Sequence, residues 1–164
     1  MYKLFILLSI LISGCGTYPV AKFDSDQVTL LCEDQNHQPV TIVKNYKAKY
    51  LRDLAYATWN EETEEREIHI SDNITDHWPL SVVEFVAYHE CAHHQLDHID
   101  TSEHPEPRLL WSDKAMMEER DADCDAIETF YSVNGEDKYE SLLDDLKSFG
   151  HLPRPRLKRI SLCI

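Results

Sequence analysis

The chain has 164 residues, which is enough for one domain around a single hydrophobic core. Hydrophobic residues make up 43% of it, an ordinary share for a folded protein that excludes a wholly disordered chain. The 30 Asp and Glu residues outnumber the 16 Lys and Arg residues and give a formal net charge of -14. This balance argues against nucleic acid, or an anionic membrane surface, as a partner.

The first 14 residues have the order of an export signal, which is set aside before the fold is considered. Lys3 supplies a positive charge, residues 4–12 are apolar, and two small residues precede Cys15. The apolar run is too short to span a bilayer as a helix. This order resembles the lipobox of bacterial lipoprotein signal peptides, in which the signal is cut in front of an acylated cysteine.

The lipobox resemblance implies that residues 1–14 are removed and that Cys15 carries a lipid anchor. Because Gly16 stands where an aspartate favours the inner membrane, it also implies a place on the periplasmic face of the outer membrane. The alternative is a plain secretory signal followed by an incidental cysteine. Both interpretations put the mature chain in an oxidising compartment.

A tether and a first hairpin are predicted next. Residues 15–27 are polar and show no periodicity, so we expect a short tether followed by one folded domain over residues 28–164. Residues 28–32 and 40–43 are rich in residue types that favour strands, and the polar stretch 33–39 between them has the composition of a turn. The two runs predict a first β-hairpin.

A second hairpin is predicted at residues 55–59 and 67–71. The second run contains two isoleucines that alternate with polar residues, and this period of two predicts a strand with one face in water. The acidic stretch 60–65 between the runs is interpreted as a solvated turn rather than a calcium site. Residues 44–54 are of mixed character and are compatible with a short helix.

Three helices are predicted in the rest of the chain, over residues 80–98, 113–133 and 137–149. Pro79 stands immediately before the first helix, where proline is typical. Ser112 or Asp113 is the expected N-cap of the second helix. Gly150 follows the third helix, as glycine commonly does at a helix end.

The first predicted helix contains the motif His89-Glu90-Cys91-Ala92-His93. Residues four apart lie on one face of a helix, so the two imidazoles can bind one Zn²⁺ ion. Glu90 follows the first ligand and is placed to act as general base on a metal-bound water. The motif also arises by chance, and the alternative is a helix whose histidine pair binds nothing.

A catalytic zinc site usually has three protein ligands and one open position. Glu119 and Asp123 lie four residues apart in the second predicted helix, so Glu119 could bind the metal while Asp123 accepts a hydrogen bond from a ligand imidazole. Glu118 and Glu128 are alternative third ligands. The extended metzincin motif is excluded, because its glycine and its third histidine are missing.

Four other histidines lie near the proposed site in the sequence. His94 and His98 are also four residues apart and are interpreted as a solvated helix face rather than an accessory metal site. His104 and His151 fall in predicted loops and are interpreted as exposed residues rather than as hydrogen-bond donors to the transition state.

Four cysteines remain, Cys32, Cys91, Cys124 and Cys163, and they predict two disulfides with three possible pairings. Because Cys91 and Cys124 fall in the two helices of the proposed site, we expect these two to pair and tie the helices together. Cys32 would then pair with Cys163. The alternative is that some are buried free thiols, and a zinc site built from them is disfavoured because the chain has no C-x-x-C pair.

His89-Glu90-x-x-His93 followed by E-x-x-A-D beginning at Glu119 resembles the gluzincin metallopeptidases. The likeness is strongest to the soluble core of the HtpX-like and CAAX prenyl endopeptidase group, and it covers roughly residues 55–160. It implies that the two histidines and Glu119 bind zinc, and that Glu90 is the general base.

The resemblance has two further implications. In these enzymes an edge strand pairs with an extended substrate, and residues 67–71 stand in its place in the sequence. His151-Leu152-Pro153 with Arg159-Ile160 is also similar to an H-P…R-I element of the group, although Leu152 stands where the group has proline.

We therefore expect an α+β fold in which a small antiparallel sheet packs on a zincin-like core of three helices. The expected function is that of a zinc-dependent endopeptidase with one Zn²⁺ ion, which hydrolyses peptide or protein substrates in the cell envelope and is held at the membrane by its lipid anchor. One alternative is a non-catalytic zinc-containing lipoprotein that acts as a binding or scaffold module, with a fourth protein ligand closing the site. Another is a metal carrier that uses the histidine-rich residues 89–104.

Overall fold

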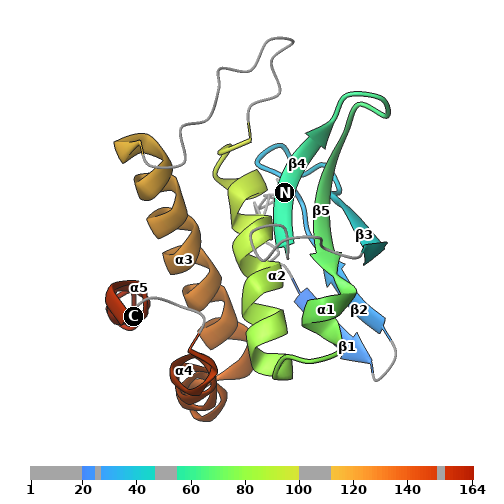
Figure 1. Ribbon diagram of the computed structural model, residues 1–164. Coiled ribbons are helices and arrows are strands. Elements are labelled where there is room, and N and C mark those ends of the chain that lie inside the picture. Colours follow the sequence, from blue (N-terminus) through green and yellow to red (C-terminus); the bar gives the residue numbers. More distant parts are fainter. Residues whose placement is uncertain (1–19, 25–26, 47–54, 100–111, 151–153) are drawn as a thin grey trace, which may run out of the picture.

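The computed structural model describes residues 20–24, 27–46, 55–99, 112–150 and 154–164. The fold is α+β, with strands in the first half of the chain and most of the helices in the second (Figure 1). The expected signal peptide, Cys15, His104 and His151 lie outside the described residues, as do residues 47–54 of the expected short helix.

The strands form two small sheets. β1 (Val20–Asp24) and β2 (Gln27–Leu31) are an antiparallel pair. β3 (Thr41–Tyr46), β4 (Ala55–Asn60) and β5 (Glu65–Ser71) form a mixed sheet in the order β3-β5-β4, in which β5 pairs antiparallel with β4 and parallel with β3. The expectation of an antiparallel sheet is therefore wrong for β3.

The first expected hairpin is also wrong. The run at residues 28–32 pairs with β1, which lies inside the expected tether, and the run at residues 40–43 pairs with β5. Between the two runs the structure has only a tight turn, closed by an isolated bridge between Glu33 and Pro39. Two backbone bonds flank the bridge, from Val40 N–H to the carbonyl of Cys32 at 2.9 Å and from Asp34 N–H to the carbonyl of Gln38 at 2.8 Å, and β2 and β3 then belong to different sheets.

The second expected hairpin is confirmed as β4 and β5. Ile68 and Ile70 are buried, as their alternation predicts. The opposite face is not open to water, however: Glu67 is 9% exposed, accepts a hydrogen bond from Asn60 at 2.7 Å and contacts His69 at 2.8 Å. β5 is the central strand, so both of its edges pair with other strands, and its two faces are largely buried as well.

The three expected helices are confirmed as α2 (Leu80–Gln95), α3 (Asp113–Asn134) and α4 (Glu136–Phe149). Ser112 is the N-cap of α3, because its hydroxyl accepts the N–H of Ala115 at 3.1 Å. Gly150 ends α4 in the left-handed conformation, with φ of +68°. Two short helices, α1 (Asp72–Thr75) and α5 (Arg154–Ile160), were not predicted.

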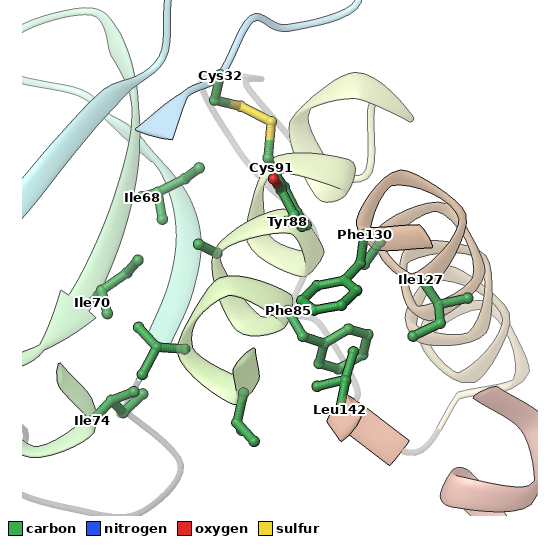
Figure 2. Packing of buried hydrophobic residues seen from close by; sticks show 14 of the residues in the cluster. Cys32, Ile68, Ile70, Ile74, Phe85, Tyr88, Cys91, Ile127, Phe130 and Leu142 are labelled. Atoms are coloured by element: carbon green, nitrogen blue, oxygen red, sulfur yellow. A yellow bond between two sulfur atoms is a disulfide. The ribbon is translucent and has the colours of Figure 1, made fainter. Parts of the chain in front are cut away.

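The core surrounds α2, which lies between the mixed sheet and α3 (Figure 1). Figure 2 shows Ile68 of β5 on one side of this helix, and Phe130 of α3 with Leu142 of α4 on the other. Tyr88 of α2 packs edge-on against Phe130, with 6.5 Å between the ring centroids. Each such buried side chain contributes about 1.5–3 kcal/mol. Because α2 is enclosed on two sides, its position is fixed independently of the chemistry it carries.

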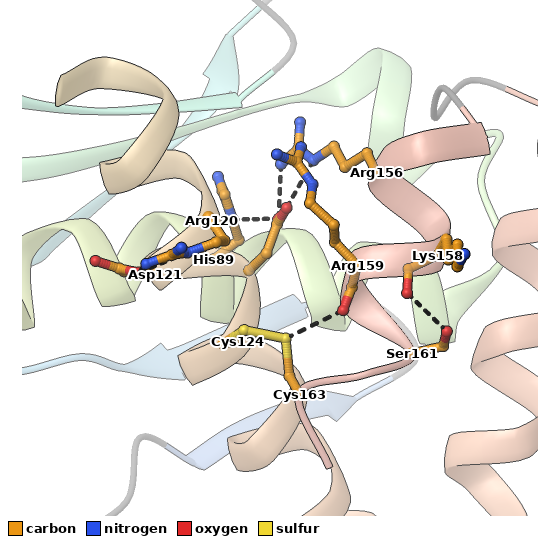
Figure 3. Close-up of a disulfide and its surroundings, with 10 residues drawn as sticks. His89, Arg120, Asp121, Cys124, Arg156, Lys158, Arg159, Ser161 and Cys163 are labelled. Carbon is orange, nitrogen blue, oxygen red and sulfur yellow. Dashed lines mark hydrogen bonds and ion pairs between the residues drawn. A yellow bond between two sulfur atoms is a disulfide. The ribbon is translucent and has the colours of Figure 1, made fainter. Parts of the chain in front are cut away.

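Both disulfides differ from the expected pairing. Cys32 pairs with Cys91, joining the end of β2 to α2, and Cys124 pairs with Cys163, joining α3 to the chain end (Figures 2 and 3). Cys91 stands two residues, or about 200° around the helix, from each histidine of the motif. The histidines face α3, so Cys91 faces away from α3 and cannot reach Cys124.

Among the described residues, no helix combines the length and the apolar character that crossing a membrane requires.

Candidate metal centre

Two imidazoles of α2 lie side by side and face α3. His89 and His93 are one helical turn apart, and their Nε2 atoms are 3.2 Å from each other. Both side chains are buried, with exposures of 7% and 4%. The helix therefore presents two nitrogen atoms to one point, as the motif predicts.

Helix α3 brings a carboxylate to the same point. One oxygen of Glu119 lies 3.4 Å from His89 Nε2, and the other lies 3.5 Å from His93 Nε2. Of the two alternative ligands, Glu118 pairs with Lys114 at 3.6 Å and Glu128 is exposed. The geometry thus groups Glu119, and not its neighbours, with the imidazoles.

The spacing of these donors fits a zinc ion. Two atoms that each lie about 2.05 Å from a tetrahedral metal are about 3.3 Å apart. The observed contacts of 3.2, 3.4 and 3.5 Å are close to that separation, and one donor atom from each residue can be chosen so that all lie within 4.8 Å. Two imidazoles and one carboxylate are also a typical donor set of catalytic zinc sites.

Asp123 lies behind His89, as predicted for a residue that orients a ligand. Its carboxylate is 3.1 Å from His89 Nδ1 and is 1% exposed. Arg156 of α5 grips the same carboxylate through two donors, Nε at 2.9 Å and Nη2 at 2.7 Å (Figure 3). Nη2 of Arg156 also lies 3.6 Å from Glu119. The bidentate pair fixes Asp123, and Asp123 in turn restrains the His89 ring.

The imidazole of His89 and the carboxylates of Glu119 and Asp123 shift one another's pKa values. Although burial alone would lower it, the carboxylates of Asp123 and Glu119 raise the pKa of His89 to about 9. Burial would raise the pKa of Glu119, but the two imidazoles hold it well below its usual value. Asp123 likewise has a lowered pKa, because His89 and Arg156 outweigh its burial. These shifts favour a protonated His89 beside ionised Glu119 and Asp123, so each group carries a charge opposite to that of its neighbour.

Glu90 lies on the sheet side of the site. It is 8% exposed, and the backbone N–H of Ala57 in β4 donates to its carboxylate. Burial raises the pKa of Glu90, and the nearby imidazoles offset this only in part. Glu90 is therefore a buried acid next to His89 and His93, the position that the motif predicts for a general base.

No match to the chain is found among protein-family models, curated proteins or solved structures. The assignment of the site accordingly rests on the chemistry and geometry of its own residues.

The interpretation of His94 as part of a solvated face is wrong. Its side chain is fully buried, and Nε2 donates to the backbone carbonyl of Glu67 in β5 at 3.0 Å. Burial lowers the pKa of His94 to about 4, so the ring is neutral at pH 7. His94 is thus committed to the sheet, because it lies on the side of α2 opposite α3.

The structure adds two residues, Arg156 and His98, to the predicted site region. Arg156 lies in the same basic run as Arg159, and only the phase of the short helix α5 decides which of the two faces α3. His98 was grouped with His94, yet its Nδ1 lies 3.1 Å from Nδ1 of His93. The five-residue spacing of His93 and His98 is visible in the sequence. The left-handed turn at Asp97 that brings the two rings together is not.

Proposed function

We propose that the protein is a zinc-dependent peptidase in which His89, His93 and Glu119 hold the ion and Glu90 is the general base. The observation that carries the proposal is the convergence of these three donors from α2 and α3 at separations that suit one zinc ion. A bound zinc ion would polarise a substrate carbonyl and lower the pKa of water to about 7.

An open coordination position supports catalysis over a purely structural site. Among the described residues, no other acid, histidine or cysteine joins the three donors in one group. His94 bonds to β5, and the four cysteines of the folded domain are paired in disulfides. Glu119 is 46% exposed, so solvent reaches one side of the group. Within the part of the chain that the structure describes, which does not include His104 and His151, no fourth protein ligand closes the site, as a structural zinc site in a scaffold module would need.

Glu90 performs the proton transfers in this proposal. Its carboxylate takes a proton from the attacking water as the new C–O bond forms, and returns it to the amine as the C–N bond breaks. A pKa raised by burial suits this role, because the group must both accept and release the proton near neutral pH. The hydrogen bond from Ala57 holds the carboxylate in place between these steps.

The structure changes which strand the substrate would follow. β5 was expected to be the edge strand, but it is the central strand of the order β3-β5-β4. β4 is the outer strand next to α2, and its Ala57 contacts Glu90. An extended peptide added along β4 would pass beside the general base, with main-chain hydrogen bonds setting its direction.

The likeness to gluzincins of the HtpX-like and CAAX prenyl endopeptidase type belongs to the same proposal, as does a lipid anchor on Cys15 at the periplasmic face of the outer membrane. Two disulfides in a small domain support an oxidising compartment. Peptides or proteins of the cell envelope are the proposed substrates.

The test compares the wild type with Glu90→Gln, which keeps the shape of the side chain and removes its basicity. We expect Glu90→Gln to retain one zinc ion per chain and to hydrolyse denatured casein about 10²–10⁴ times more slowly. Glu128→Gln, which changes an exposed glutamate of α3, is the matched control and should keep full activity. Equal cleavage by Glu90→Gln would exclude Glu90 as the base. A wild type that binds zinc but cleaves neither casein nor a random peptide library would favour the scaffold module.

A further inference from the structure

Helix α2 ends in a turn that brings the chain back toward the metal centre. Asp97 adopts φ of +55°, the left-handed region that L-residues rarely enter. The N–H of Asp97 then donates to the carbonyl of His94 at 3.4 Å, and the N–H of His98 donates to the carbonyl of His93 at 2.9 Å. This pair of bonds is a Schellman motif, which usually uses glycine at the left-handed position.

The turn is held from outside the helix. Arg66 of β5 contacts Asp97 at 3.2 Å with Nη2, and its Nε contacts Asp34 at 3.0 Å. The side chains of Arg66 and Asp34 are 10% and 5% exposed, so this anchor is nearly buried. Left-handed backbone at a residue other than glycine costs free energy and persists where its surroundings fix it. The contact of Arg66 with Asp97 contributes to that constraint, together with the two backbone hydrogen bonds of the turn.

Because of this turn, the His93 ring contacts His98 as well as His89 and Glu119. Nδ1 of His98 lies 3.1 Å from Nδ1 of His93, and the ring centroids are 5.2 Å apart. His93 Nε2 faces His89 and Glu119, so its two nitrogens are used on opposite sides. A neutral imidazole has one donor and one acceptor nitrogen. If Nε2 is to offer a lone pair to a metal, Nδ1 must carry the hydrogen and donate it to His98.

We propose that His98 is a positioning residue that holds His93 in the tautomer and orientation needed for metal binding. This role rests on the proposed function and adds to it a partner for the second ligand. His98 does for His93 what Asp123 does for His89. It does so by accepting a hydrogen bond from the His93 ring, and it lies at the end of the same helix. It is not a fourth ligand, because its contact is with the nitrogen of His93 that points away from Glu119.

The experiment measures zinc affinity by competition with a chromophoric chelator in wild type, His98→Ala and His98→Asn. We expect His98→Ala to bind zinc about 10–100-fold more weakly. His98→Asn should recover most of this loss, because its amide oxygen can accept the Nδ1–H of His93. His77→Ala, which removes an exposed imidazole, is the matched control and should bind as the wild type does. Circular dichroism in the presence of EDTA checks that each variant is folded.

A spectroscopic readout separates positioning from a general structural effect. In zinc-loaded, ¹⁵N-histidine-labelled protein, the N–H···N bond should give a ¹⁵N–¹⁵N coupling between Nδ1 of His93 and Nδ1 of His98. Unchanged zinc affinity in His98→Ala, no recovery in His98→Asn, or no such coupling would each overturn the role of His98. A wild type that binds no zinc would instead overturn the proposed function on which this role depends.

Discussion

The two imidazoles of the candidate metal centre are supported in different ways. His89 is backed by Asp123 across the helix interface, and Asp123 is gripped by Arg156, 33 residues further along the chain. His93 is backed by His98, only five residues away at the end of the same helix. One support is assembled by tertiary packing, and the other by a local turn.

The difference predicts how each support fails. The support of His89 depends on the docking of α5, which the disulfide between Cys124 and Cys163 ties to α3. A change there should lower the stability of the fold and the affinity for zinc together. The support of His93 lies in the turn that ends α2, and the core sets the position of that helix. A change there should alter zinc affinity with a much smaller effect on stability.

The largest effect is expected from Asp123→Asn. It leaves the guanidinium of Arg156 without its carboxylate, and removing one partner of a buried pair costs about 3–5 kcal/mol. We expect about 3 kcal/mol here, because Arg156 is 27% exposed. Denaturant unfolding in EDTA measures this loss, and zinc affinity should fall about 10–100-fold.

The same pair offers a control for that result. Replacing both partners, as in Asp123→Leu with Arg156→Leu, removes the unpaired guanidinium, although Nδ1 of His89 still loses its contact with Asp123. The double variant should therefore cost less stability than Asp123→Asn alone. A double variant that is less stable than the single one would show that packing, and not charge pairing, supports His89.

A comparable loss of stability is expected from removing one disulfide. Cys124→Ser with Cys163→Ser should lower the free energy of unfolding by about 2–4 kcal/mol and weaken zinc binding, because α5 carries Arg156. Cys32→Ser with Cys91→Ser should also lose stability, but its folded form should bind zinc nearly as well, since the core holds α2. If loss of the Cys32–Cys91 disulfide weakened zinc binding more than loss of the Cys124–Cys163 disulfide, the dependence of His89 on α5 would be refuted.

The smallest effect is expected from Asp97→Gly. Glycine adopts the left-handed conformation without strain, while the ion pair of a half-exposed Asp97 with Arg66 is worth at most about 1 kcal/mol. The two changes should nearly cancel, so thermal unfolding and zinc affinity should both stay close to wild type. A loss of more than about 2 kcal/mol would mean that the side chain of Asp97, rather than the turn itself, maintains the helix end.

Features set by neighbouring residues could be predicted from the sequence. The Ser112 cap acts on an N–H three residues away, and the pairs His89 with His93 and Glu119 with Asp123 follow from the helical repeat. For the same reason α2, α3, α4 and the hairpin of β4 and β5 were predicted close to their observed bounds.

Features that depend on which sides of two elements meet could not be predicted in the same way. The parallel pairing of β3 with β5 has no signature in a short strand, and Asp97 does not carry the glycine signal of a left-handed turn. Arg156 faces α3 only because α5 forms with a particular phase. The side of α2 that carries Cys91 does follow from the sequence, because the helical repeat turns Cys91 away from the face that carries the two histidines.

The most direct test of the central claim is the zinc content of purified protein after equilibration with equimolar zinc and gel filtration. Mass spectrometry of the metal should find one zinc ion per chain in the wild type, and almost none in His93→Ala and Glu119→Ala. A wild type without zinc, or ligand variants that keep the full zinc content, would contradict a metal centre held by α2 and α3.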